Sequence, residues 1–110
     1  MTPEQILSIK PKVLTQKQRE RYFDEGYLLL ERFLPDRWIE RLRRTTEAAV
    51  DKSRAVTQSD AVWDLDKGHT AAAPRLRRLS SMNDHFADYW AYASAADSPL
   101  PDAIADLVGP

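Results

Sequence analysis

Two histidines, His69 and His85, are the side chains with the clearest potential for metal chemistry. A non-haem iron site needs two histidines and a carboxylate on one face, usually with a histidine and an acid two residues apart on a strand. Neither histidine is followed by an acid at that position. His85 and Asp88 could share a helix face at i,i+3, but an exposed first-turn histidine is the favoured interpretation. His69 is interpreted as a turn residue.

Nucleophilic catalysis and phosphate binding also lack a complete motif. The chain has no cysteine, no G-x-S-x-G elbow, and only three widely separated glycines. A dense basic stretch of Arg75, Arg77 and Arg78 could bind a carboxylate or a coenzyme phosphate. The favoured alternative is a solvated strand face that pairs with Asp64 and Asp66 across a hairpin.

The three tryptophans, Trp38, Trp63 and Trp90, lie in amphipathic patterns, which favours a core role over a ligand-binding box. The residue types and spacings therefore form no complete reaction centre. We assign no catalytic, cofactor-binding or metal-binding residue from them.

Composition indicates a soluble protein of single-domain size. The 110 residues are 43% hydrophobic and 30% charged, with a formal net charge of -1. This near-neutral balance argues against nucleic acid as a partner. The chain shows no secretory signal, and its longest strongly apolar run, Tyr27–Leu30, is far shorter than the roughly 20 residues of a membrane helix. We expect a cytoplasmic protein with no membrane partner, and the pattern indicates no oligomeric state.

Local sequence signals mark where the first elements begin and end. Residues 1–14, with two prolines, are expected to form an extended N-terminal arm. Thr15 and Gln18 make a capping-box pair that opens a helix over 16–25. Gly26 ends this helix in the left-handed conformation that a C′ residue commonly takes.

A strand and a long helix are expected next. The stretch Tyr27–Phe33 is apolar on both faces at first and then alternates, which is typical of a strand buried at one end. A helix follows from about Asp36 to Arg54. Its apolar stripe comprises Trp38, Ile39, Leu42, Thr46, Ala49 and Val50.

The second half predicts a hairpin and two helices. Residues 61–65 and 74–79 are expected to form short antiparallel strands joined through Gly68. Ser81 should cap a helix with Asp84 three residues on. The side chains expected to be buried on that helix are Phe86, Tyr89, Trp90 and Ala93. A last helix over 101–108 should bury Ile104, Leu107 and Val108. The fold class is therefore α+β, mainly helical with a few short strands.

The stretch "LTQKQRERYFDEGYLLLERFLPDRWIERLR", residues 14–43, closely resembles the N-terminal region of the phytanoyl-CoA dioxygenase family. The shared pattern is a Leu-Thr helix start, a glycine-terminated helix, an apolar strand, and a Phe-Leu turn into an amphipathic helix. The later stretches "PRLRRLSSMNDHFADYW" and "LPDAIADLVGP" resemble the next segments of the family. The resemblance covers essentially the whole chain from Leu14 onward.

The resemblance implies an Fe(II)- and 2-oxoglutarate-dependent oxygenase built on a double-stranded β-helix, or jelly roll. In that family a His-x-Asp pair and a distal histidine hold the iron, and a basic residue holds 2-oxoglutarate. All of these follow the segment that resembles "LVGP", so no residue here is matched to them. The resemblance implies that residues 15–110 are the N-terminal portion of a dioxygenase domain, truncated before the metal-binding core and inactive alone. Iron, 2-oxoglutarate and a small-molecule substrate would bind only the full-length parent.

An alternative class remains open. The chain could be a free-standing helical protein-interaction module that binds a partner through the Trp38 stripe or the arginine stretch. A strand-rich segment with a His-x-Asp pair beyond Pro110 would favour the oxygenase, and a stop codon there would favour the module.

Overall fold

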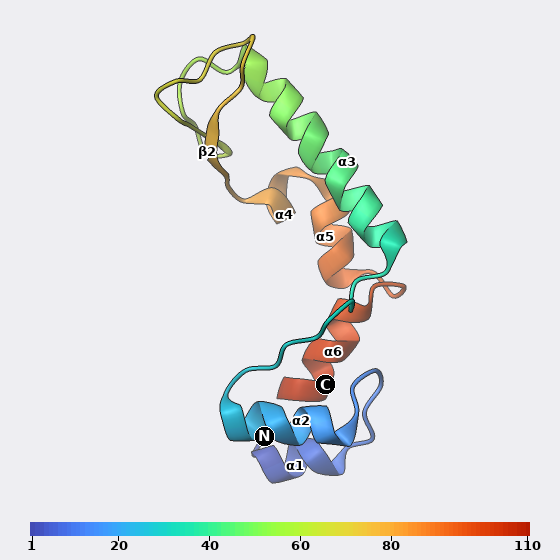
Figure 1. Ribbon diagram of the computed structural model, residues 1–110. Coiled ribbons are helices and arrows are strands. Elements are labelled where there is room, and N and C mark those ends of the chain that lie inside the picture. The colour runs from blue at the N-terminus through green and yellow to red at the C-terminus, as the bar shows by residue number, and fades with distance from the viewer. The chain divides into compact units, whose positions relative to one another are not determined.

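The computed structural model describes all residues from 1 to 110, which divide into two units. The first unit joins Met1–Pro35 with Ala93–Pro110, and the second is Asp36–Tyr92. Helices dominate, and the single sheet has two antiparallel strands, in agreement with the predicted α+β class (Figure 1). No helix has both the length and the apolar character needed to cross a membrane.

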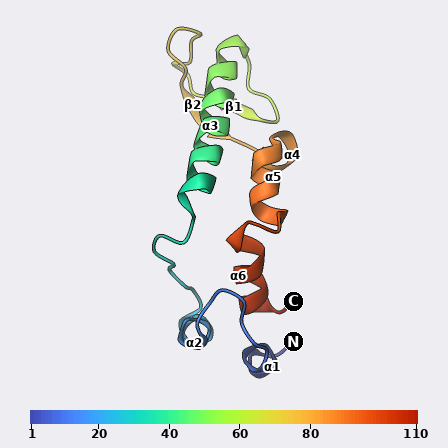
Figure 2. The same cartoon turned by 90° about the vertical axis from the view of Figure 1, so that its right-hand side faces the viewer.

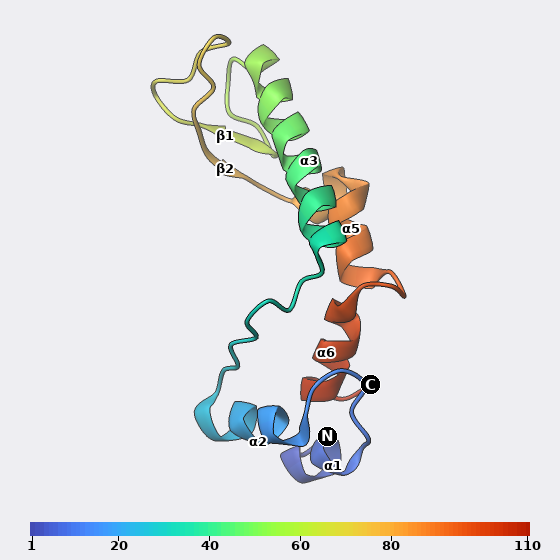
Figure 3. The same ribbon diagram turned by 45° about the vertical axis from the view of Figure 1, so that its right-hand side comes forward.

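The first unit contains three helices, α1 (Pro3–Ser8), α2 (Gln16–Glu25) and α6 (Pro99–Val108). Each of the three contacts the other two (Figure 3). Ile6, Leu14 and Ala103 are the buried apolar residues between them. Segments about 90 residues apart in the sequence therefore form one small core.

Helix α1 corrects the prediction of an extended arm over residues 1–14. Thr2 accepts a hydrogen bond from the Gln5 backbone, and the Gln5 side chain accepts one from the Thr2 backbone. Pro3 occupies the first helical position, where its missing N–H costs nothing and its fixed φ suits a helix. The Thr2–Gln5 spacing is the same as that of Thr15–Gln18, so the sequence contained a capping-box signal for α1 as well.

Helix α2 has the predicted bounds and the predicted ends. Thr15 and Gln18 form the reciprocal capping box, and Gly26 follows at φ 81°, ψ 1°. The Gly26 N–H donates to the Tyr22 carbonyl at 2.8 Å. The positive φ is why a glycine is needed here.

Replacing Gly26 with valine should therefore lower the free energy of unfolding by about 1–3 kcal/mol. Nothing lies within 4 Å of an added Cβ, so the cost is backbone strain alone. Gly68→Ala is the control, because its Cβ would meet only the exposed end of Arg75, 2.6 Å away, which can swing aside. Urea unfolding of both variants provides the comparison, and equal losses would show that the positive φ is unimportant.

The predicted strand over Tyr27–Phe33 is wrong in this structure. Residues 27–30 lie outside any helix or strand, and Arg32 adopts φ 52° in a turn. The only sheet consists of two other strands, so this segment has no neighbour with which to pair. A strand is defined by its ladder, and an apolar pattern alone cannot supply one.

The second unit begins with α3 (Asp36–Lys52), which continues into a 3₁₀ turn, η1 (Ser53–Ala55). This agrees with the predicted helix over 36–54. Trp38 and Ala49 of the predicted stripe are buried, but Ile39 is 37% exposed. One face of α3 therefore carries the core of this unit.

A hairpin follows, made of β1 (Trp63–Leu65) and β2 (Leu76–Leu79) (Figure 2). The strands pair antiparallel, with Trp63 opposite Leu79 and an irregularity between Asp64 and Leu65. The Trp63 indole N–H donates to the Ala49 carbonyl at 2.9 Å. This hydrogen bond connects the hairpin to α3. The predicted strands and their antiparallel pairing are confirmed, although both strands are shorter than expected.

The single helix predicted after Ser81 is wrong. Two helices are present, α4 (Met82–His85) and α5 (Ala87–Ser94), and Phe86 between them is extended at φ -130°, ψ 111°. The Phe86 ring packs edge-on against Trp63, with centroids 6.5 Å apart. Ser81 itself has φ 54° and makes no side-chain cap. Contact with the hairpin is thus accompanied by a break in the helix.

Helix α6 starts two residues earlier than predicted, because Ser98 caps it and Pro99 follows as its first residue. Its buried face is also different. Ala103 and Asp106 are buried, whereas Ile104 and Val108 are about half exposed. The prediction assigned the apolar residues to the core, but a buried carboxylate occupies that face instead.

Candidate functional site

His69 has a structural role that uses both ring nitrogens. Its Nδ1 accepts a hydrogen bond from the Arg75 N–H, and its Nε2 lies 2.9 Å from the Ser53 carbonyl oxygen. Since Nδ1 is the acceptor, the neutral ring carries its proton on Nε2 and donates it to Ser53. The His69 N–H also donates to the Asp66 carbonyl, so the predicted turn role is confirmed. No lone pair is left for a metal ion.

His85 and Asp88, the possible i,i+3 pair, do not share a continuous helix face. His85 ends α4 and Asp88 lies in the first turn of α5. The Asp88 carboxylate instead accepts from the Thr45 hydroxyl at 2.5 Å and from Arg41 Nε at 2.6 Å. These two donors, Thr45 first, lower the pKa of Asp88 below its ordinary value. This carboxylate therefore joins α5 to α3.

The basic stretch of Arg75, Arg77 and Arg78 is mostly paired across the hairpin. Arg78 Nε lies 2.8 Å from Asp64, and Arg75 Nη2 lies 3.1 Å from Asp66. Both arginines are largely exposed, so each pair contributes little to stability. This confirms the interpretation of a solvated strand face and leaves Arg77 as the exposed arginine between the two pairs.

The tryptophans differ in burial. Trp38 is 1% exposed and packs edge-on against Tyr92 at 5.7 Å, with the Arg41 guanidinium 4.7 Å from the ring centroid. Trp63 is half-buried. Trp90 is 58% exposed, so its predicted place in the core is wrong. Because the helix is broken at Phe86, α5 does not continue the helix face on which Trp90 was predicted to be buried.

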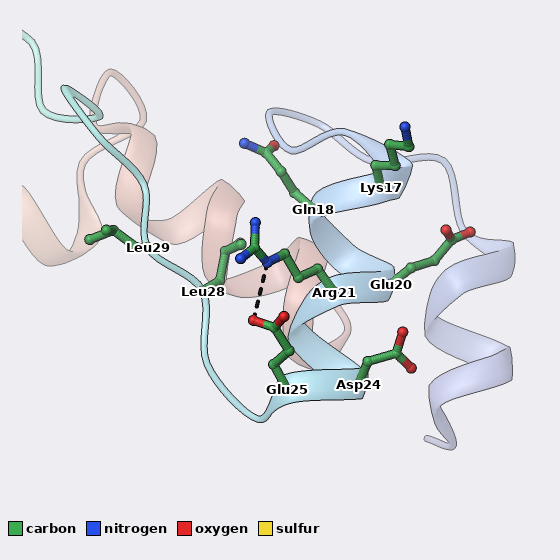
Figure 4. Close-up of a pocket in the computed structure, with 8 residues that line it drawn as sticks. All are labelled: Lys17, Gln18, Glu20, Arg21, Asp24, Glu25, Leu28 and Leu29. Carbon is green, nitrogen blue, oxygen red and sulfur yellow. Dashed lines mark hydrogen bonds and ion pairs between the residues drawn. The ribbon is translucent and has the colours of Figure 1, made fainter.

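The first unit has a groove between α2 and the segment that follows it. It is lined on one side by polar residues of α2 and on the other by Leu28 and Leu29, and it has a volume of about 480 Å³. Figure 4 shows Leu28 and Leu29 on opposite sides of the backbone, with the Arg21–Glu25 ion pair, 3.1 Å long, next to Leu28. A second hollow of about 510 Å³ shares most of this lining and extends it to Tyr27 and Glu31.

The charges around this groove are mainly negative. Four carboxylates line the two hollows, against two cations. One of the cations, Arg21, is already paired with Glu25. The acidic residues are Glu20, Asp24, Glu25 and Glu31, and the other cation is Lys17.

The segment beside the groove alternates between exposed and half-buried side chains but belongs to no strand. Tyr27 and Leu29 are 62% and 75% exposed, whereas Leu28 and Leu30 are half-buried. None of the backbone hydrogen bonds formed outside the helices and the hairpin involves residues 27–30. The groove is therefore mainly polar, with Leu28 as its half-buried apolar side chain.

The helix that lines the groove is held in place by a buried polar cluster. Arg19 of α2 is 1% exposed and donates to the carbonyls of Asp106, Ile9 and Ile6. The bond to Asp106 is 2.8 Å long. One guanidinium therefore ties α2 to α6 and to the segment around α1.

The Asp106 carboxylate completes this cluster and is only 4% exposed. It accepts from three successive backbone N–H groups, Lys12 and Val13 at 2.8 Å and Leu14 at 2.9 Å. Burial is the largest single influence and raises its pKa. The three N–H groups, helped by the charge of Arg19, outweigh burial and lower the pKa below its ordinary value.

Sequence reasoning identified neither the groove nor this cluster. Arg19 and Asp106 look like ordinary surface charges on amphipathic helices, and their partners are remote in the sequence. The groove had a signal, because "YLLL" was identified as an apolar strand. The missing information was that no strand of this chain pairs with it.

The donor set of this chain does not fit a non-haem iron site. No group of three or more His, Cys, Asp or Glu side chains could hold a metal ion. His69 and Asp88 are engaged by other donors and acceptors, as described above. We therefore assign no iron or 2-oxoglutarate ligand among these residues and derive no catalytic step from them.

Comparison with known proteins gives one match. A family model described as phytanoyl-CoA dioxygenase matches residues 22–108, which is most of the chain. No curated protein and no solved structure matches this chain. The matched region runs from the end of α2 to the end of α6 and includes the whole second unit.

Proposed function

Because the chain belongs to the phytanoyl-CoA dioxygenase family, we propose that it is the N-terminal helical portion of an Fe(II)- and 2-oxoglutarate-dependent oxygenase. The match over residues 22–108 is the observation that carries this proposal. The reaction would be the hydroxylation of a small organic substrate with O₂ as the oxidant. Iron and 2-oxoglutarate would supply the oxidising chemistry when bound.

In this proposal, the ligands for iron and 2-oxoglutarate lie on a jelly-roll barrel formed by other residues of the same polypeptide. The role of the present residues is to build a helical layer. The Arg19–Asp106 cluster supports this role in the first unit, and the packing of α5 and the hairpin on α3 supports it in the second. The 110 residues alone would be catalytically inactive.

Metal titration tests the proposal that the metal ligands lie outside these 110 residues. The 110-residue chain should show no stoichiometric micromolar binding of Mn(II), used in place of Fe(II), with or without 2-oxoglutarate, because it lacks a facial triad. Isothermal titration measures this directly, and a polypeptide extended past residue 110 should bind one metal ion. Micromolar binding to the short chain that strengthens with 2-oxoglutarate would contradict the proposal.

The alternative interaction module is favoured less than the oxygenase by the two surfaces on which it was based. Trp38 is buried inside its own unit, and Arg75 and Arg78 are paired with aspartates of the hairpin.

A further inference from the structure

We infer that His69 is an acid-sensitive latch for the loop of the β1–β2 hairpin, holding the loop closed while its imidazole is neutral and releasing it when the ring gains a proton. The loop comprises residues 66–75, between β1 and β2. This inference does not depend on the oxygenase assignment, because it rests on hydrogen bonds within the second unit.

The His69 residue connects three segments of the backbone. Its Nδ1 accepts the Arg75 N–H at 2.9 Å, immediately before β2, and its Nε2 lies 2.9 Å from the Ser53 carbonyl oxygen in η1. Its own N–H donates at 3.0 Å to the carbonyl of Asp66, immediately after β1. One residue therefore holds both ends of the loop and attaches them to η1.

A protonated imidazole cannot keep both ring contacts. Both nitrogens of the cation carry a hydrogen, so the ring only donates. The Arg75 N–H would then face a second donor, and no rotation of the ring supplies an acceptor. The contact with Ser53 survives, because its carbonyl oxygen accepts from either form of the ring. Protonation therefore releases the Arg75 end of the loop selectively.

The charged groups around the ring offer no replacement for the lost hydrogen bond. The ring lines a hollow of about 360 Å³, whose cations are Arg54 of η1 and Lys67 of the loop. The carboxylate of this hollow, Asp66, already pairs with Arg75 at 3.1 Å. The α3 carboxylate that reaches this region, Asp51, pairs with Arg54 at 3.0 Å. An imidazolium therefore has no unpaired carboxylate among these groups.

The direction of the pH dependence follows from the number of bound protons. The closed loop has a neutral imidazole, whereas in the open loop a solvated imidazole takes up a proton near pH 6.5, as histidine ordinarily does. Closure is therefore fully favoured above about pH 7.5 and weakens as the pH falls through about 6.5. Lowering the pH from 7.5 to 5.5 should raise the equilibrium constant for opening about tenfold.

Amide exchange of the 110-residue chain, followed by NMR, tests the inference. We expect the protection factor of the Arg75 amide, corrected for the intrinsic exchange rate, to fall about tenfold between pH 7.5 and 5.5. Amides of α2, in the other unit, should keep their protection over this range. The imidazole ¹⁵N shifts of His69 provide a measurement that needs no variant, and at pH 7.5 they should show a proton on Nε2 and none on Nδ1.

Two variants separate the latch from a general effect of acid. His69→Asn keeps a side-chain oxygen that can accept the Arg75 N–H and has no group that titrates, so the protection of Arg75 should no longer depend on pH. The matched control is His85→Asn, which removes the other histidine, an exposed one, and should leave the change of about tenfold intact.

An Arg75 protection factor that is the same at pH 7.5 and 5.5 would overturn the inference, as would an equal fall in His69→Asn. Loss of the effect in His85→Asn would assign it to the wrong histidine. A proton on Nδ1 of His69 at pH 7.5 would contradict the hydrogen-bond arrangement itself. None of these outcomes bears on metal binding by the longer polypeptide, so this test and that of the oxygenase assignment can fail separately.

Discussion

Replacement of Asp106 by alanine should destabilise the first unit by roughly 3–5 kcal/mol. The substitution leaves the N–H groups of Lys12, Val13 and Leu14 without their acceptor, and each buried unpaired donor is costly. It also removes a negative charge that interacts favourably with Arg19. Urea unfolding should show the loss, and amide exchange at residues 12–14 should accelerate.

Asp102→Ala is the matched control. Asp102 lies one turn earlier on α6 and accepts from the Lys12 ammonium group at 3.0 Å, but both side chains are substantially exposed. Its loss should cost less than about 1 kcal/mol. Similar losses for the two variants would show that the Asp106 cluster contributes no more than a surface ion pair.

Acid should weaken the same cluster. The pKa of Asp106 is lower in the folded protein than its ordinary value, so its contribution is fully present above the ordinary pKa. That contribution falls as the pH drops through the folded pKa, which places the loss below roughly pH 4. A plot of unfolding free energy against pH should therefore be flatter in this range for Asp106→Ala than for the parent. Parallel plots would contradict the stated cause of the pKa shift.

Replacement of Trp38 by alanine should have the largest effect in the second unit, a loss of about 3–5 kcal/mol. Trp38 is 1% exposed, and its removal leaves a cavity next to Tyr92 and takes away the ring beneath Arg41. The near-UV circular dichroism signal and the urea midpoint of this unit should both fall.

Trp90→Ala provides the comparison for the same chemical change at an exposed position. Trp90 is 58% exposed, so its truncation should cost less than about 1 kcal/mol. A loss at Trp90 as large as that at Trp38 would contradict the assignment of Trp38 as the core residue of this unit.

Local signals predicted those elements that depend on neighbouring residues. The capping box at Thr15 and Gln18 and the left-handed Gly26 define α2 almost unaided, because each requires only contacts within one turn. The hairpin was predicted from two short apolar runs and its cross-strand ion pairs from their charges. The helix at Pro3–Ser8 had the same capping signal and was overlooked because two prolines suggested an extended arm.

Features that depend on remote partners could not be predicted. The apolar Tyr27–Leu30 run became an unpaired segment because a strand requires a second strand beside it. Asp106 is buried because three N–H groups more than 90 residues away converge on it, which no periodicity reveals. The Phe86 break, too, accompanies a contact with Trp63 rather than any local stop signal.

Turnover of 2-oxoglutarate tests the central claim most directly. The reading frame that contains this chain should be expressed with the residues that follow Pro110 and supplied with Fe(II), O₂, 2-oxoglutarate and ascorbate, which provides the electrons that an organic substrate would otherwise provide. We predict one equivalent of succinate and CO₂ per 2-oxoglutarate consumed, lost on removal of Fe(II), and no turnover by the 110 residues alone. A stop codon directly after Pro110, or an iron-loaded longer polypeptide that leaves 2-oxoglutarate intact, would contradict the assignment as part of an oxygenase.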